Sequence, residues 1–358
     1  MKKLLSLLLK TLVILAALLG LYFAVQPLSG LNQVSLYNVL FPGRERLPFG
    51  ESPDTAYNFS IDSLDAMFAS HKISAAGEKS ADKLRVVLIG DSSAWGTLLR
   101  PEETLCGQLD GASLADGRVI ECYNLAYPTL SLSKDLLLLN RALEYEPDLI
   151  LWSMTMESFP KDKEESNALV QANLAEYESI TGGEAVDSPR ESLWEQRREL
   201  ADWLRLQLYG VMWSATGIDQ DYPEEYTAPR TDLDADNTYH GVEGPLPDEM
   251  LNWELLEKGL AMAGDTPVVV INEPMLISSG ENSKIRYNYY YPREAYDAWH
   301  EALITRLAEN GGDLLDLTDL LEVERFTNSA IHYDAEGAGR VATETIEHIE
   351  SLIQNGQL

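Results

Sequence analysis

Five short hydrophobic runs recur along the chain at a spacing typical of α/β proteins. Most of them are almost entirely apolar, as in strands that are covered on both faces of a parallel sheet. The predicted strands are Leu84–Ile89, Arg118–Tyr123, Asp148–Ser153, Pro267–Ile271 and Asp313–Leu317. Helical patterns separate or follow them, over Glu102–Leu114, Ser131–Tyr145, Glu294–Asn310 and Ala338–Ile353. This alternation predicts an α/β fold with a parallel five-stranded sheet and helices on both faces.

The interval between the third and fourth strands is too long for one crossover helix. It covers about residues 159–266 and indicates an insertion of helices and loops. Within it, Glu191–Tyr209 has the pattern of an amphipathic helix, with Leu204 and Leu208 among its predicted buried positions. Residues 27–80 lack a strong periodicity and are interpreted as a stalk. The main folded domain is predicted to cover residues 81–358.

A basic and then apolar amino terminus precedes the stalk. Lys2 and Lys3 are followed by the run Leu4–Val25, which only the charge of Lys10 interrupts. About 20 apolar residues span a bilayer, so residues 1–26 are predicted to form a transmembrane helix that anchors the chain in the cell membrane. The flanking charges place the body on the extracytoplasmic side. A cleaved signal peptide is the alternative, but we favour the anchor because no clean cleavage motif lies near Ala24.

The composition adds a strong excess of acidic residues. The 358-residue chain has 58 Asp and Glu against 27 Lys and Arg, a formal net charge of −31. This charge argues against nucleic acid and anionic lipid as partners attracted over long range. Outside the cytoplasm the only two cysteines, Cys106 and Cys122, form a candidate disulfide, whose alternative is two small buried side chains.

The first strand leads directly into the turn Gly90-Asp91-Ser92. A serine at the carboxyl end of a parallel strand lies where such sheets gather their ligands. Polar segments also follow the second strand, over 124–129, and the third, over 155–158, and His332 lies just before the last helix. All of these segments meet at one edge of the sheet. We therefore interpret Ser92 as a nucleophile and His332 as its base, although the tripeptide alone also fits an ordinary surface turn.

With these segments the chain resembles the SGNH, or GDSL-type, hydrolases over roughly residues 84–158 and 267–353. The resemblance implies a flavodoxin-like three-layer sandwich and a serine esterase or O-acyltransferase without a cofactor. It also implies that the oxyanion site is formed by Ser92, Thr129 and the position of Glu157. Anchored, outward-facing members of this superfamily act on cell-surface polysaccharides, so it implies an acylated, in particular acetylated, glycan as substrate and the envelope acylation machinery as partner.

Two positions depart from the family's pattern. Glu157 stands in place of the oxyanion asparagine, and a carboxylate repels an oxyanion unless it is protonated. Ser329 stands in place of the aspartate that supports the base, and Asn328 precedes it. Either can accept a hydrogen bond from His332, but neither carries the charge that stabilises an imidazolium. The alternative function is therefore a catalytically disabled binding or scaffold protein in polysaccharide modification.

Two further loops carry candidate binding residues. A tyrosine-rich loop after the fourth strand suits a sugar, although the same side chains also suit simple packing. Its candidate substrate-binding residues are Glu273, Asn282, Arg286, Tyr287 and Asn288. An acidic loop follows the spacing of a calcium site but lacks its turn glycine, so we favour a solvated loop and expect no metal. Its candidate ligands are Asp232, Asp234, Asp236 and Glu243.

Overall fold

A central sheet of five parallel strands organises the computed structural model, which describes residues 2–24, 71–164, 167–182 and 231–358 and a few single residues between these ranges. The strands are β1 Lys83–Ile89, β2 Val119–Asn124, β3 Leu149–Met154, β6 Val268–Asn272 and β7 Asp313–Asp316. They lie in the order β2–β1–β3–β6–β7. Taken along the chain this is the order 2-1-3-4-5 of flavodoxin-like sheets, which confirms the predicted fold class.

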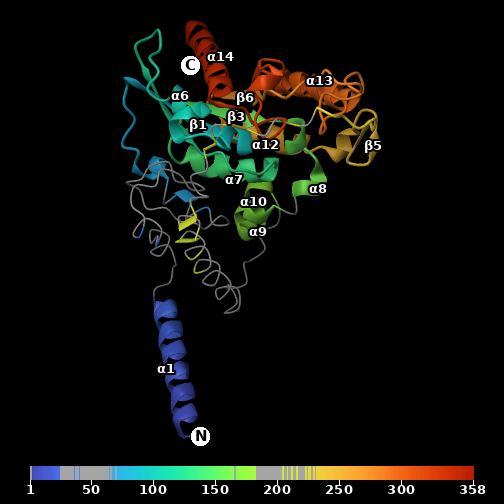
Figure 1. The fold of residues 1–358 in the computed structure, drawn as a ribbon. Helices are drawn as coiled ribbons and strands as arrows, with labels where there is room; N and C mark the ends of the chain where they lie inside the picture. The colour runs from blue at the N-terminus through green and yellow to red at the C-terminus, as the bar shows by residue number, and fades with distance from the viewer. Residues whose placement is uncertain are drawn as a thin grey trace.

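Helices cover both faces of this sheet (Figure 1). One face packs against α6 (Leu105–Leu109) and α14 (Ala335–Gln354). The other packs against α7 (Leu132–Leu143), α12 (Trp253–Ala263) and α13 (Arg293–Asn310). Successive residues of a strand point to opposite faces, so Val86 and Leu88 join the first layer of side chains while Val87 and Ile89 join the second. The interiors of β1, β3 and β6 are therefore buried, whereas Leu314 of β7 is only half-buried.

Helix α6 is shorter than the sequence predicted. The segment 102–114 divides into a 3₁₀ turn, Pro101–Glu103, and α6, because Thr104 caps a new helix by accepting a hydrogen bond from the Gly107 amide at 3.1 Å. A disulfide joins Cys106 of α6 to Cys122 of β2, with a Cα–Cα distance of 5.6 Å. The covering helix is thus covalently fastened to the edge strand.

The insertion lies mainly against α7. Its described elements include the short helices α8 (Lys161–Glu164), α9 (Ala168–Ala172) and α10 (Leu174–Thr181), the hairpin of β4 (Thr238–Tyr239) and β5 (Val242–Glu243), and helix α12. Helices α9 and α10 lie beside α7 on the side away from the sheet (Figure 1). Helix α7 is therefore enclosed between two layers, and its run of leucines from 136 to 139 is fully buried.

The predictions for the insertion differ from the structure in several places. Helix α12 was not predicted at all. Most of the predicted helix Glu191–Tyr209 lies outside the described residues. Leu204 and Leu208, which are described, are 49% and 63% exposed, so the prediction that they are buried is wrong.

The amino-terminal run forms helix α1, Lys2–Ala24. Within the described residues, no helix is both long and apolar enough to cross a membrane, so the structure does not support the predicted transmembrane span. Most of the predicted stalk lies outside the described residues, but its end belongs to the core. Leu64, Met67 and Ile73 are fully buried, and His71 donates from Nε2 to the carbonyl of Asn124 at 2.8 Å. The packed core therefore begins before residue 81.

Candidate active site

Ser92 lies in a tight turn at the carboxyl end of β1. It is the first residue of α5 (Ser92–Trp95), which Asp91 caps by accepting from the Ser93 amide at 2.8 Å. A side chain at Gly90 would place its Cβ 2.8 Å from the Cβ of Ala94, so only glycine fits there. The close packing of this turn fixes the position of Ser92.

His332 reaches Ser92 from a loop between β7 and α14. This loop is closed by a hydrogen bond of 2.8 Å from the amide of Thr327 to the carbonyl of His332, and the amide of Leu276 donates to Ala330 at 2.7 Å. The loop directs the imidazole toward β1, where Ser92 Oγ lies 2.7 Å from His332 Nε2. Two residues that the sequence separates by 240 positions thus form a hydrogen-bonded pair.

Asn328 is the group that orients the imidazole. Its Oδ1 lies 2.8 Å from His332 Nδ1. Because an amide oxygen only accepts, Nδ1 carries the proton and Nε2 is left to accept from Ser92. Burial lowers the pKa of His332 to about 4, so the ring is neutral at pH 7. Of the two candidate supports for His332, Asn328 contacts its ring, whereas Ser329 has no hydrogen bond to it among the described residues.

The two proposed oxyanion groups outside Ser92 are engaged elsewhere. The amide of Thr129 donates to the carbonyl of Tyr127 at 2.6 Å and is not free to hold an oxyanion. The carboxylate of Glu157 accepts from Lys163 and Tyr239, and His240 Nε2 lies 3.4 Å from each of its oxygens. An adjacent ammonium group favours the ionised carboxylate. The structure therefore argues against a neutral Glu157 that donates to the oxyanion.

The amide of Ser92 remains as an oxyanion donor. Within the described residues it has no hydrogen-bond acceptor, and it belongs to the same turn as the attacking oxygen. The neighbouring loop is held in place by Asn124, whose Nδ2 donates to the carbonyl of Ala94 at 3.1 Å and whose Oδ1 accepts from the Ala126 amide at 3.1 Å. Sequence reasoning did not single out Asn124, because one amide at a strand end carries no distinct signal.

Arg286, the first substrate-binding candidate to test, serves the loop's own structure. It is 6% exposed, and its guanidinium group donates to four backbone carbonyls at 2.7–3.1 Å. These carbonyls belong to Asp236, Asn288, Tyr289 and Tyr290. Since five N–H donors are the whole capacity of an arginine, little remains for a substrate. Its predicted role as a sugar contact stays a prediction.

The other four candidates of this loop are also engaged within the protein. Asn282 donates to the carbonyl of Leu233 at 2.8 Å, and the fully buried Asn288 donates to the carbonyl of Leu276 at 3.1 Å. Glu273 accepts from the Ser153 hydroxyl at 2.6 Å, and the Tyr287 hydroxyl donates to Asp297 at 2.6 Å. The alternative interpretation of the loop as packed structure fits these contacts.

Two of the candidate metal ligands in the acidic loop bond to neighbouring residues of that loop. Asp236 accepts from the amide and the hydroxyl of Thr238 at 2.8 and 2.9 Å, and Glu243 accepts from Asn237 at 3.2 Å. In the described parts of the chain no three His, Cys, Asp or Glu side chains gather closely enough to hold a metal ion. Asp232, Asp234, Asp236 and Glu243 are therefore not gathered into a cluster of metal ligands among the described residues.

A buried charged cluster beneath the Ser92 turn was missed by the sequence analysis. Lys134 and Asp135 in the first turn of α7 are 0% and 2% exposed, and Asp91 and Glu273 are each 1% exposed. Burial raises the pKa of Asp91 to about 6 and raises the pKa of Glu273 well above its usual value. Charged residues in a first helical turn are normally solvated. The only signal was the leucine run that follows them, which indicates a helix covered on all sides.

Comparisons with known proteins give remote structural similarity only. No family model matches the chain, and no curated protein matches it. The similar solved structures include a lipolytic G-D-S-L family member from Veillonella parvula, at 10% identity and a TM-score of 0.37 over 74% of this chain and 97% of that one. A psychrotrophic esterase from Pseudoalteromonas matches at 11% identity and a TM-score of 0.40 over 75% of this chain and 98% of that one. A carbohydrate acetylesterase from Sinorhizobium meliloti matches at 15% identity and a TM-score of 0.35 over 75% of this chain and 100% of that one.

Proposed function

We propose that the chain is a serine ester hydrolase or O-acyltransferase in which Ser92 is the nucleophile and His332 the base. The observation that carries this proposal is the 2.7 Å contact between Ser92 Oγ and His332 Nε2, with the other ring nitrogen held by Asn328. A nucleophile, a base and a group that orients the base form the arrangement required for covalent acyl transfer.

The reaction follows from this arrangement. His332 Nε2 takes the hydroxyl proton as Ser92 Oγ bonds to the acyl carbon, and the amide of Ser92 stabilises the oxyanion. When the ester C–O bond breaks, His332 returns the proton to the leaving alcohol. Water or an acceptor hydroxyl then attacks the acyl group on Ser92 while His332 takes its proton, and as the Ser92–acyl bond breaks His332 returns that proton to Ser92 Oγ. Because Asn328 supplies no negative charge for the imidazolium, turnover is slow.

The proposed substrate is an acylated, in particular acetylated, glycan outside the cytoplasm, with the envelope acylation machinery as the partner. The disulfide between Cys106 and Cys122 supports this location because disulfides persist in oxidising compartments. Protein purified without reductant and denatured should show no free thiol, and protease added to spheroplasts should digest the body. A single-pass attachment to the membrane through residues 1–26 stays a prediction.

The enzyme proposal is tested by comparing wild type with Ser92→Ala and His332→Ala. We expect a fluorophosphonate probe to label wild type at Ser92 and to leave the Ser92→Ala variant unlabelled. Hydrolysis of p-nitrophenyl acetate and of acetylated oligosaccharides should fall to background in both variants. Equal rates in the three proteins, with no labelling of Ser92, would rule out the enzyme.

A second candidate function is a binding or scaffold protein with a disabled site. The ion pair between Glu157 and Lys163 favours it, because a charged carboxylate stands where the resembled family has its oxyanion asparagine. The same comparison separates the two functions: folded wild-type protein that neither reacts with the probe nor turns over either ester, yet binds an acetylated oligosaccharide in calorimetry, would be a scaffold.

A further inference from the structure

We propose that Lys134 is a positioning residue of the Ser92–His332 site, whose ammonium group holds together the two loops that follow β1 and β2. This inference rests on the proposed function. It concerns a side chain that lies behind the reacting groups and takes no part in the proton transfers.

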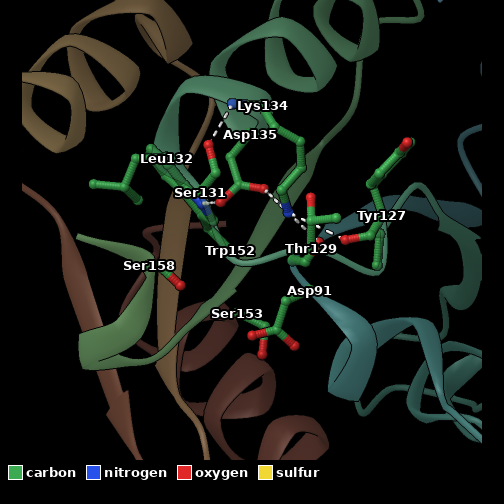
Figure 2. Close-up of polar contacts among 12 residues, drawn as sticks. Asp91, Tyr127, Thr129, Ser131, Leu132, Lys134, Asp135, Trp152, Ser153 and Ser158 are labelled. Atoms are coloured by element: carbon green, nitrogen blue, oxygen red, sulfur yellow. Dashed lines mark hydrogen bonds and ion pairs between the residues drawn. The ribbon is translucent and has the colours of Figure 1, made fainter. Parts of the chain in front are cut away.

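The ammonium group of Lys134 is fully buried and has two hydrogen bonds and one ion pair. Its Nζ lies 2.6 Å from the carbonyl oxygen of Gly90, 3.3 Å from that of Tyr127 and 2.6 Å from Asp135 Oδ1. Figure 2 shows Lys134, Asp135 and Tyr127 near the start of α7, with Asp91 and Ser153 at the neighbouring strand ends. An ammonium group has three N–H donors, and three acceptors surround this one. The three acceptors lie on three different segments: the turn after β1, the loop after β2 and the first turn of α7.

The two carbonyls place Lys134 between the nucleophile turn and the adjacent loop. Gly90 stands two residues before Ser92, and Tyr127 lies in the loop after β2. The amide of Tyr127 also donates to the Gly90 carbonyl at 3.0 Å, so the two loops are already in contact. Lys134 adds a cation that bonds to both carbonyls. The bond to Gly90 fixes the orientation of the peptide group that joins Gly90 to Asp91, which directly precedes Ser92.

The reason for a cation at this point is the charge around it. Asp91, Asp135 and Glu273 are all at most 2% exposed, and Lys134 is attracted to each of them. A neutral side chain could not bond to two carbonyls and balance buried carboxylates at the same time. Asp135 is held by a second donor, Trp152 Nε1 at 3.0 Å, which keeps its carboxylate facing Lys134.

A purely structural role predicts a different outcome from a positioning role. If Lys134 serves only to neutralise Asp135, removing both charges together should restore a normal site. If Lys134 positions the Gly90 and Tyr127 carbonyls, the neutral pair should fold and yet react slowly. The test therefore uses the double variant Lys134→Met with Asp135→Asn beside Lys134→Met alone, because the single variant leaves a buried unpaired carboxylate that destabilises the fold. Asn at 135 still accepts from Trp152.

Arg85→Met is the matched control. Arg85 is 7% exposed and donates to the carbonyls of Tyr145 and Gly77 at 2.8 Å each, but it lies near the start of β1 instead of its end. It is therefore a buried cation with similar contacts, placed away from Ser92. The full-length proteins are compared at equal folded fraction by the rate of Ser92 labelling with a fluorophosphonate and by kcat and KM for p-nitrophenyl acetate.

We expect the double variant to label roughly 100-fold more slowly than wild type, because a displacement of about 1 Å at a reacting group has effects of that size. The loss should lie in kcat with KM little changed, and Arg85→Met should label at the wild-type rate. A double variant that labels at the wild-type rate would overturn the role of Lys134 and leave the enzyme proposal standing.

A wild type that the fluorophosphonate does not label would refute the enzyme proposal but would not test the positioning role. That role is therefore also tested by a measurement that does not depend on activity. The ¹⁵N chemical shift of His332 Nε2 reports its hydrogen bond to Ser92. We expect that shift to change in the double variant and to stay unchanged in Arg85→Met. An unchanged shift in the double variant would refute the positioning role whatever the activity.

Discussion

His332 Nδ1 lies 2.8 Å from Oδ1 of Asn328, so a neutral amide occupies the place where a charged carboxylate would stabilise the protonated base. The amide oxygen selects the tautomer that leaves Nε2 free for Ser92, which is the orienting half of the usual carboxylate role. The amide carries no negative charge, so it does not stabilise the protonated ring as a carboxylate would. The site is therefore arranged for proton transfer but has a weak base.

Replacing Asn328 by aspartate should raise the rate. A carboxylate at the same position would stabilise the imidazolium, and each unit by which it raises the pKa of His332 is worth about 1.4 kcal/mol, or roughly tenfold. We expect kcat for p-nitrophenyl acetate to increase about tenfold or more. Ser329→Asp is the control, since Ser329 has no hydrogen bond to the ring in the described structure. An equal gain in both variants would show that net charge near the loop, and not the contact with Nδ1, is responsible.

The activity should resist acid. His332 must be neutral to accept the proton of Ser92, and burial lowers its pKa to about 4. We therefore expect kcat/KM to stay level as the pH falls from about 8 to about 5 and to drop near pH 4, because kcat/KM reports the free enzyme's base. Circular dichroism at each pH checks that the protein stays folded. An acid limb near pH 6.5, the ordinary value of histidine, would contradict the burial of the ring.

Asp91→Asn should stabilise the fold more at high pH than at low pH. Burial raises the pKa of Asp91 from 3.8 to about 6, so its ionisation favours the unfolded chain as the pH rises between these values. The cost is full above about pH 6 and absent below about pH 4. Asparagine keeps the acceptor for the Ser93 amide. We expect urea unfolding to show a gain on the order of 3 kcal/mol at pH 8 that falls to about 1 kcal/mol at pH 4.5. An equal effect at both pH values would refute a charge-based cause.

Glu164→Gln should destabilise the protein more than Glu176→Gln. Glu164 is 6% exposed and accepts from the Ser131 hydroxyl at 2.6 Å and from the amides of Leu132 and Ser133 at 3.1 and 2.9 Å, at the positive end of α7. A glutamine cannot accept with both of its terminal atoms, so we expect a loss of about 2–3 kcal/mol in the free energy of unfolding.

Glu176 is the matched comparison because it also joins the insertion to α7. It pairs with Arg141 at 2.8 Å in a partly exposed position, where a salt bridge contributes less than about 1 kcal/mol. Urea denaturation of the two variants measures the difference. Equal losses would mean that Glu164 acts only as a surface charge.

The strands and the meeting of Ser92 with His332 were predictable from the sequence. Buried strands require apolar runs, and these runs mark every strand of the sheet to within one residue at either end. Parallel strands bring their carboxyl ends to one edge, so a serine after β1 and a histidine after β7 lie at the same edge. Because β3 and β6 separate these two strands, it is the loop before α14 that brings His332 to Ser92. These features follow from local patterns and from the geometry of a parallel sheet.

The roles of Arg286, Glu157 and Lys134 were decided only by the tertiary structure. Arg286 and Glu157 have the composition of ligand-binding groups, but the structure surrounds the first with backbone carbonyls and the second with Lys163 and Tyr239. Lys134 has the pattern of a solvated helix start and becomes fully buried because the loops after β1 and β2 close around its ammonium group. Whether a polar side chain meets solvent, substrate or another part of the chain depends on residues distant in sequence. Periodicity records only which side of its own helix or strand a residue occupies.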